Sequence, residues 1–264
     1  MPDLYRSVQT NLWNLRTKEK GTCMLIGKSI ALVTGANRGI GRSFVEQLLA
    51  YGARRVYAAA RRKSDLEPVV ALDPGRVVAI ELDVTDLDQV SAAATTAEDV
   101  NLLINNAGVA HVGSVLDVSP GAARRDMEVN YFGALAVARA FAPVIEANGG
   151  GGLVNLLSVV SLASMPGIGG YNASKAAAWS LTQSLRADLG KRGISVFGIF
   201  PGPVDTDMSR GVPVAKSDPN EVARAVLEGI EAGIEDIFPD RMSREAYATW
   251  AVNHKAVERQ FAAM

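Results

Sequence analysis

The amino-acid sequence predicts an α/β protein: one doubly wound parallel sheet with helices on both faces, in a single domain. Short apolar runs alternate with helical segments along the chain, which is typical of a parallel sheet covered by helices. A glycine-rich turn follows the first apolar run directly. The 264 residues suit one large domain, and neither a composition shift nor an internal repeat marks a second one.

Hydrophobic periodicity places the individual elements. Short apolar runs predict buried strands, whereas apolar positions three or four residues apart predict helices. Strands are expected at residues 30–33, 55–59, 77–82, 100–104, 153–157 and 194–200. Helices are expected at residues 40–51, 86–96, 120–145, 171–192, 219–233 and 241–263, the last with Trp250 and Phe261 available for packing. The domain is therefore expected to span residues 28–264 and to end in a C-terminal helix.

Residues 1–27 precede the first strand and are expected to form a poorly ordered extension. Leu4, Leu12, Trp13 and Leu15 stand among polar residues, so a short amphipathic arm is the alternative. The segment has no long apolar stretch of the kind that secretory signals contain. No apolar run in the sequence reaches the roughly 18 residues of a membrane span.

The net charge of −1 and the single cysteine argue against several classes of site. A near-neutral chain offers no electrostatic footprint for nucleic acid or for an anionic membrane. Cys23 alone cannot form an internal disulfide, and two histidines, His111 and His254, do not make a metal site. No metal is expected. A lone cysteine fits a reducing compartment, and a cytoplasmic location is expected.

The glycine-rich turn indicates a phosphate-binding site. It reads Thr34-Gly35-Ala36-Asn37-Arg38-Gly39-Ile40-Gly41 and joins the first strand to the first helix. Glycines allow a sharp turn and a close approach to a pyrophosphate, and the helix N-terminus presents free N–H groups to the anion. The spacing differs from the common G-x-G-x-x-G, and a tight turn without a ligand is the alternative.

Basic residues after the second strand favour NADP(H) over NAD(H). An acidic residue there would bind the ribose 2′-hydroxyl of NAD, but this chain has Arg61, Arg62 and Lys63 instead. Arginine binds a 2′-phosphate through charge-assisted hydrogen bonds, and Arg38 adds a second cation within the turn. A solvated basic turn is the alternative.

Tyr171 and Lys175 are the candidate catalytic pair. They stand four residues apart on a predicted helix and therefore share one face. A free tyrosine has a pKa of about 10, and a nearby ammonium together with an oxidised nicotinamide ring is expected to lower it. Ser158 ends the preceding strand and could polarise a carbonyl oxygen.

Together these motifs resemble those of the short-chain dehydrogenase/reductase superfamily, which has a Rossmann-like fold. The resemblance extends over about residues 28–238. It rests on the glycine turn, Asp83-Val84, Asn105-Asn106-Ala107-Gly108, Asn130, Ser158, Tyr171-x3-Lys175 and Pro201-Gly202-Pro203-Val204-Asp205-Thr206.

The resemblance implies a role for each of these positions. Ser158, Tyr171, Lys175 and Asn130 would form a catalytic tetrad, in which Asn130 holds a water that links Lys175 to solvent. Asp83 and Val84 would contact adenine, Lys175 the nicotinamide ribose, and Val204 and Thr206 the carboxamide. The full set of implied cofactor residues is Gly35, Asn37, Arg38, Gly39, Ile40, Gly41, Arg61, Asp83, Val84, Asn106, Ala107, Gly108, Lys175, Pro201, Gly202, Val204 and Thr206.

The expected activity is hydride transfer between NADP(H) and a small carbonyl or alcohol substrate, with Tyr171 as the general acid–base. A non-catalytic NADP(H)-binding regulator and a lyase or isomerase on the same fold are the alternatives. The short segment 207–218 predicts an open substrate pocket, and the pocket is expected to include Val109, His111, Met165, Ile168 and Met208. Alanine-rich helices suit a homodimer or homotetramer, although the sequence at 236–240 differs from that of many family tetramers.

Overall fold

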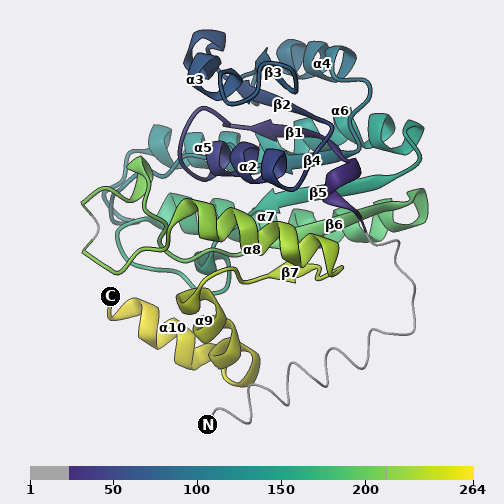
Figure 1. Cartoon of the computed structure of the whole chain (residues 1–264). Coiled ribbons are helices and arrows are strands. Elements are labelled where there is room, and N and C mark those ends of the chain that lie inside the picture. The colour runs from purple at the N-terminus through teal and green to yellow at the C-terminus, as the bar shows by residue number, and fades with distance from the viewer. Residues whose placement is uncertain (1–23, 212) are drawn as a thin grey trace.

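The computed structural model describes residues 24–211 and 213–264. These residues form a seven-stranded parallel sheet in the order β3-β2-β1-β4-β5-β6-β7 (Figure 1). The strands are β1 (Ile30–Thr34), β2 (Arg55–Ala60), β3 (Val77–Glu81), β4 (Leu102–Asn105), β5 (Gly151–Leu156), β6 (Ile194–Ile199) and β7 (Asp236–Ile237). The strand order reverses between β1 and β4, and ligands of such sheets bind beyond the carboxyl ends of the strands at that point.

Helices cover both faces of the sheet, as predicted (Figure 1). On one face α2 (Gly39–Ala50), α3 (Glu67–Val70) and α8 (Pro219–Glu231) bury apolar side chains such as Phe44 and Val226. On the other, α4 (Leu87–Thr96), α6 (Ala134–Ala147) and α7 (Gly169–Leu189) bury Phe141, Leu185 and their neighbours. Short helical turns connect these elements: η1 (Ile26–Lys28), η2 (Lys63–Leu66), η4 (Val159–Ser161), η5 (Gly190–Arg192) and η6 (Asp207–Ser209).

The prediction of one regular helix at 120–145 is wrong. It consists of α5 (Pro120–Met127), a π-helical turn η3 (Glu128–Gly133) and α6. The turn lies against the residues after β3, since a Cβ on Gly133 would come within 2.6 Å of the Val84 side chain. A π-turn adds a residue without interrupting the apolar face, so periodicity does not reveal it.

The predicted C-terminal helix at 241–263 is also two helices, α9 (Arg241–Val252) and α10 (His254–Ala262). Between them Asn253 adopts an extended φ of −152°, and its side chain accepts a hydrogen bond from the Ala256 N–H. Asparagine favours this N-cap position because its side chain replaces a missing helical partner. Both helices lie beyond β7, the last strand of the sheet (Figure 1).

Two smaller features also differ from the prediction. The helical segment η2–α3 and the two-residue strand β7 are too short for periodicity to indicate. Ile26, just before the predicted domain start, is buried in the core, and its N–H donates to Glu231. Residues 1–23 of the predicted extension lie outside the described residues. None of the described helices is long and apolar enough to cross a membrane.

Candidate active site

The glycine turn has the backbone geometry that its sequence predicts. Gly35 and Gly39 have φ values of +65° and +54°, which side chains other than glycine rarely adopt. A Cβ on Gly41 would lie 2.2 Å from the Gly35 carbonyl oxygen, so α2 starts in direct contact with the turn. A Cβ on Gly39 would approach the Thr206 methyl group to 3.1 Å. A tight glycine turn that leads directly into a helix N-terminus fits a phosphate-bearing ligand.

A cavity of about 460 Å³ lies between the start of α2 and the segment after β6. Its lining includes Gly39, Ser43, Thr206, Lys216 and Asn220. In the segment after β6, the Ser209 hydroxyl donates to the Val204 carbonyl oxygen at 2.6 Å, and Val204 pairs with Ser217 in a parallel bridge. The residues after β6 are thus held opposite the glycine turn, where Val204 and Thr206 were predicted to contact the cofactor.

Thr34 joins the glycine turn to the end of β4. Its hydroxyl accepts hydrogen bonds from the N–H groups of Asn106 and Ala107, both at 3.0 Å. The Asn106 amide in turn donates to the Thr34 carbonyl at 2.8 Å and to the Gly35 carbonyl at 3.2 Å. These contacts bring the two predicted cofactor segments together where the strand order reverses. The prediction had not included Thr34 among the site residues.

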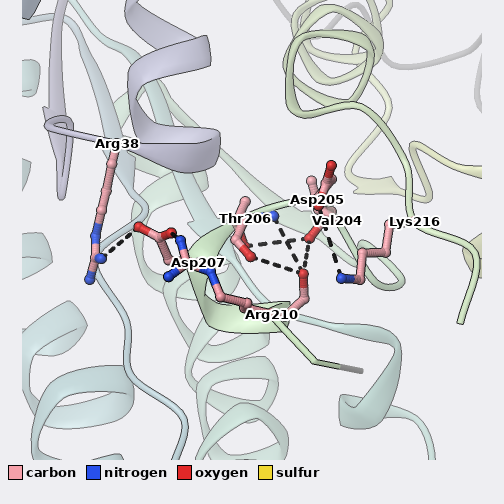
Figure 2. A network of polar contacts seen from close by, with 8 residues as sticks. Arg38, Val204, Asp205, Thr206, Asp207, Arg210 and Lys216 are labelled. Atoms are coloured by element: carbon pink, nitrogen blue, oxygen red, sulfur yellow. Dashed lines mark hydrogen bonds and ion pairs between the residues drawn. The ribbon is translucent and has the colours of Figure 1, made fainter. Parts of the chain in front are cut away.

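The two arginines predicted to bind a 2′-phosphate have different charged neighbours. Arg38 is exposed and forms an ion pair with Asp207 at 2.9 Å, and Asp207 also pairs with Arg210 (Figure 2). Arg61 is exposed at the end of β2 and lies close enough to Asp83 to help lower the pKa of that carboxyl. Asp207 was not predicted. Its carboxylate competes for Arg38 with any bound phosphate.

Asp83, predicted to contact adenine, is engaged within its own turn. Burial acts to raise the pKa of its carboxyl, but hydrogen bonds from the Thr85 N–H at 2.9 Å and hydroxyl at 2.7 Å, with Arg125 and Arg61 nearby, lower it overall. The carboxylate thus stays charged and orders the turn after β3. The neighbouring Val84 is buried against η3.

Ser158, Tyr171 and Lys175 meet beyond the carboxyl end of β5. Ser158 caps η4, where its hydroxyl oxygen accepts from the Val160 N–H at 3.3 Å, and it lies close enough to the Tyr171 hydroxyl to lower the pKa of that group. One turn further along α7, the Lys175 Nζ lies 5.6 Å from the centre of the Tyr171 ring. This ammonium donates to the Leu156 carbonyl oxygen at 2.6 Å. The predicted pair therefore shares one helix face and adjoins Ser158.

The residues around Tyr171 raise its pKa by themselves, and the lowering expected with an oxidised nicotinamide ring stays a prediction. Removal from water raises the pKa of Tyr171 to about 12, against the lowering effect of the Ser158 hydrogen bond, and the Asp126 charge raises it further. Burial lowers the pKa of Lys175 to about 8, partly offset by Asp126. The sequence could not show how strongly the site excludes water.

Asn130 connects the residues after β4 to α7. Its amide oxygen accepts from the Val109 N–H at 2.9 Å, and its amide nitrogen donates to the Val109 carbonyl and the Ser174 hydroxyl, both at 2.8 Å. A Cβ on Gly108 would lie 3.0 Å from the Asn130 oxygen and 3.6 Å from the Lys175 Nζ. Asn130 and Lys175 therefore both border Gly108, although the water relay implied by the resemblance stays a prediction.

Pro201 and Gly202 are held from both sides. The Pro201 carbonyl accepts from the Val159 N–H at 3.0 Å, and the Gly202 N–H donates to the Asp240 carboxylate at 2.8 Å. Asp240 also begins α9 as its N-cap. The C-terminal helices thus position the residues after β6, a contribution that the sequence analysis missed.

Of the expected pocket residues, Met165 and Ile168 pack in one cluster with Tyr171, Met242 and Trp250. The last two come from α9, so the C-terminal region supplies apolar surface beside the tyrosine. Met208 is 54% exposed. Val109 packs against the core cluster that contains Phe141 and Leu185. The His111 Nδ1 lies 2.7 Å from the Asp126 carboxylate, a contact that the sequence does not predict. Within the described residues no group of three or more metal-ligating side chains is found.

Replacing Lys175 with methionine is expected to stabilise the fold at neutral pH by about 1–3 kcal/mol. The Lys175 pKa is about 8 when folded against 10.5 as the usual value, so the unfolded chain binds the proton more tightly. Wild-type stability therefore rises with pH between these values. The advantage of the variant in denaturant titrations should be full near neutrality and shrink as the pH rises above about 8.

The exposed residue Lys191 provides the control, since methionine there removes a charge without relieving burial. A Lys175→Met protein that is no more stable than wild type at neutral pH would contradict the buried-ammonium interpretation.

The profile of the short chain dehydrogenase family matches residues 29–216. This chain belongs to the short-chain dehydrogenase family. It is an enzyme of the oxidoreductase type, and its family binds nicotinamide cofactors and acts on small molecules. The resemblance recognised from the motifs and the predicted Rossmann-like fold are both confirmed.

Individual relatives of this short-chain dehydrogenase differ in their substrates and cofactors. It is 36% identical over 194 residues to a 3-alpha-(or 20-beta)-hydroxysteroid dehydrogenase of Mycobacterium bovis, covering 72% of this chain and 74% of that protein. It is 37% identical over 199 residues to carbonyl reductase (NADPH) 2 of Sus scrofa, covering 75% and 79%.

Solved structures agree on the fold. A short chain dehydrogenase from Burkholderia cenocepacia in complex with NADP superposes with a TM-score of 0.85 at 42% identity, covering 90% of this chain and 99% of that one. A short chain dehydrogenase/reductase from Burkholderia phymatum in complex with NAD has a TM-score of 0.80 at 27% identity, covering 89% and 96%. Both nicotinamide cofactors therefore occur among proteins of this shape.

Proposed function

We propose that this short-chain dehydrogenase transfers a hydride between NADP(H) and a carbonyl or alcohol carbon, with Tyr171 as the general acid–base. One observation carries the proposal: the Ser158 hydroxyl lies close enough to Tyr171 to lower its pKa, and Lys175 is on the same face of α7 as Tyr171. A protein that only binds a cofactor has no need for a partly buried tyrosine with an ammonium one helical turn away.

The chain's own residues can handle the proton. At neutral pH the raised pKa keeps Tyr171 protonated, so its hydroxyl can donate to a carbonyl oxygen that is becoming an alkoxide. Ser158 can donate a second hydrogen bond to the same oxygen. The Lys175 ammonium then stabilises the phenolate that remains, because an opposite charge nearby favours the ionised tyrosine. These steps support the direction of carbonyl reduction.

The cofactor would lie along the ends of β1, β4 and β6. The glycine turn from Gly35 to Gly41 would hold its pyrophosphate, and Val204 and Thr206 its nicotinamide end. When bound, NADP(H) supplies or accepts the hydride. Arg38 and Arg61 would bind the 2′-phosphate, and the carbonyl reductase (NADPH) and NADP-bound relatives support this choice over NAD(H).

The direct test is NADPH oxidation by the wild-type protein with a panel of ketones and aldehydes. Turnover with at least one of them, faster with NADPH than with NADH, is the expected result. Tight NADPH binding without turnover of any carbonyl compound, or of alcohols with NADP⁺, would instead favour a non-catalytic binding protein. Conversion of a substrate without net oxidation or reduction would favour a lyase or isomerase. The cytoplasmic location and the homo-oligomeric state stay predictions.

An Arg61→Ala change is expected to weaken NADPH binding by about 10-fold while NADH binding changes less than about twofold, since a charge-assisted contact to the 2′-phosphate is lost. Titration of each cofactor by intrinsic fluorescence or calorimetry measures both constants. Arg62→Ala is a matched control, because Arg62 pairs with Asp65 at 2.9 Å. Equal losses for NADPH and NADH in the Arg61 variant would refute the assigned role.

A further inference from the structure

A buried carboxylate outside the predicted tetrad adjoins the catalytic groups. Asp126 on α5 is completely buried, and its Oδ1 lies 2.7 Å from the Nδ1 of His111. Asp126 stands one helical turn before Asn130, and both side chains hold the residues that follow β4: Asn130 binds Val109 and Asp126 binds His111. A carboxylate is costly to bury without partners, so this one needs an explanation.

Asp126 is incompletely paired. Its second oxygen, Oδ2, has no hydrogen-bond partner in the described structure. A Cβ on Gly170 would lie 2.8 Å from that oxygen, which places the carboxylate directly beneath the residue that precedes Tyr171. The charge of Asp126 also reaches both Tyr171 and Lys175. The carboxylate therefore lies between the His111 ring and the catalytic helix face.

The loop that carries His111 runs beside the segment leading to Tyr171. The Gly113 N–H donates to the Gly167 carbonyl at 2.7 Å, and Gly113 pairs with Ile168 in a parallel bridge. The His111 side chain is 40% exposed, unlike the carboxylate that holds it. The imidazole is therefore held at Nδ1 and partly open to solvent, on a loop that runs beside the segment leading to Tyr171.

The contact with Asp126 determines which ring nitrogen is available. An ionised carboxylate only accepts hydrogen bonds, so Nδ1 carries the proton that it donates to Asp126. Nε2 is left to interact elsewhere: it accepts a hydrogen bond when the ring is neutral and donates one when the ring is protonated. A hydroxyl group can match it in either state, because it is both a donor and an acceptor.

We propose that His111 is a specificity-determining residue that binds a hydroxyl group close to the reacting carbonyl, and that Asp126 is the positioning residue that holds its ring. The favoured substrates would be hydroxy-ketones or hydroxy-aldehydes, which reduction converts to diols while the bound hydroxyl stays unchanged. This inference rests on the proposed function, since it concerns the substrate of the same site.

The kinetic test compares α-hydroxyacetophenone with propiophenone, which replaces the hydroxyl by a methyl group of similar size. The wild-type ratio of kcat/KM values should favour the hydroxy-ketone, and His111→Leu should reduce that ratio by about 10-fold or more. His111→Gln, which restores a hydrogen-bonding side chain, should recover part of the preference. His254→Leu, at an exposed position on α10, is the matched control and should leave the ratio unchanged. An unchanged ratio in His111→Leu would overturn the proposal.

A second readout does not depend on turnover. The chain has two histidines, so nitrogen-15 NMR of the imidazole rings gives two sets of signals, which His254→Leu assigns. In the presence of NADP⁺, α-hydroxyacetophenone should shift the His111 Nε2 signal, whereas propiophenone should not. Asp126→Asn should change the His111 tautomer and weaken this response. A ring that responds equally to both ketones would refute the assignment, even if the enzyme turns both over. A selective shift without turnover would support the binding role while contradicting the proposed function.

Discussion

A Tyr171→Phe protein is expected to reduce ketones about a thousandfold more slowly than wild type, in kcat/KM, while binding NADPH within about twofold of the wild-type affinity. Phenylalanine keeps the ring that packs with Met165 and Ile168 and removes only the hydroxyl beside Ser158. The loss should therefore lie in the proton-transfer step. Single-turnover measurements of NADPH oxidation at saturating ketone would show the change in rate directly.

Tyr247→Phe provides a matched control for this change. Tyr247 lies on α9 and stacks on Phe238, with ring centres 4.2 Å apart, so it has an aromatic environment without the catalytic neighbours. Its replacement should leave the rate within about twofold of wild type. If Tyr171→Phe retained wild-type turnover, another group would have to supply the proton, and the proposed acid–base role would be wrong.

Gly41→Ala is expected to destabilise the protein by about 3 kcal/mol, lowering the melting temperature by about 10 °C, and to abolish tight cofactor binding. The added Cβ would lie 2.2 Å from the Gly35 carbonyl oxygen and 2.5 Å from the Asn106 amide nitrogen. The backbone atom cannot rotate away, so the glycine turn must separate from α2. The same displacement moves the N–H groups that would bind the pyrophosphate.

The matched control is Gly121→Ala on α5, where an added Cβ meets nothing within 4 Å. This change should be neutral or slightly stabilising, because alanine favours a helix over glycine. Thermal unfolding with and without NADPH distinguishes the two effects of Gly41→Ala. A variant with wild-type stability and an unchanged NADPH-induced rise in melting temperature would show that the turn tolerates a side chain there.

The elements that the sequence predicted correctly are those whose causes are local. The strands from β1 to β6 and the alternating helices are indicated by apolar runs and periodicity. The elements that it missed depend on a few residues: Asn253 ends one helix and begins the next, and the π-turn around Asn130 accommodates a contact with Val84 from a distant strand end. Periodicity averages over many positions and does not register such single-residue effects.

The same division holds for the site. The glycine turn could be predicted from the residues alone, because Gly35 and Gly39 adopt φ values that other residues avoid. The shared face of Tyr171 and Lys175 could be predicted too, because four residues make about one helical turn. The pairing of Asp207 with Arg38, the contact between Asp126 and His111, and the raised pKa of Tyr171 became visible only in the folded chain. Ion pairing and removal from water depend on which side chains meet in space. The side chains that meet here belong to different segments of the chain, so local sequence patterns do not reveal their contacts.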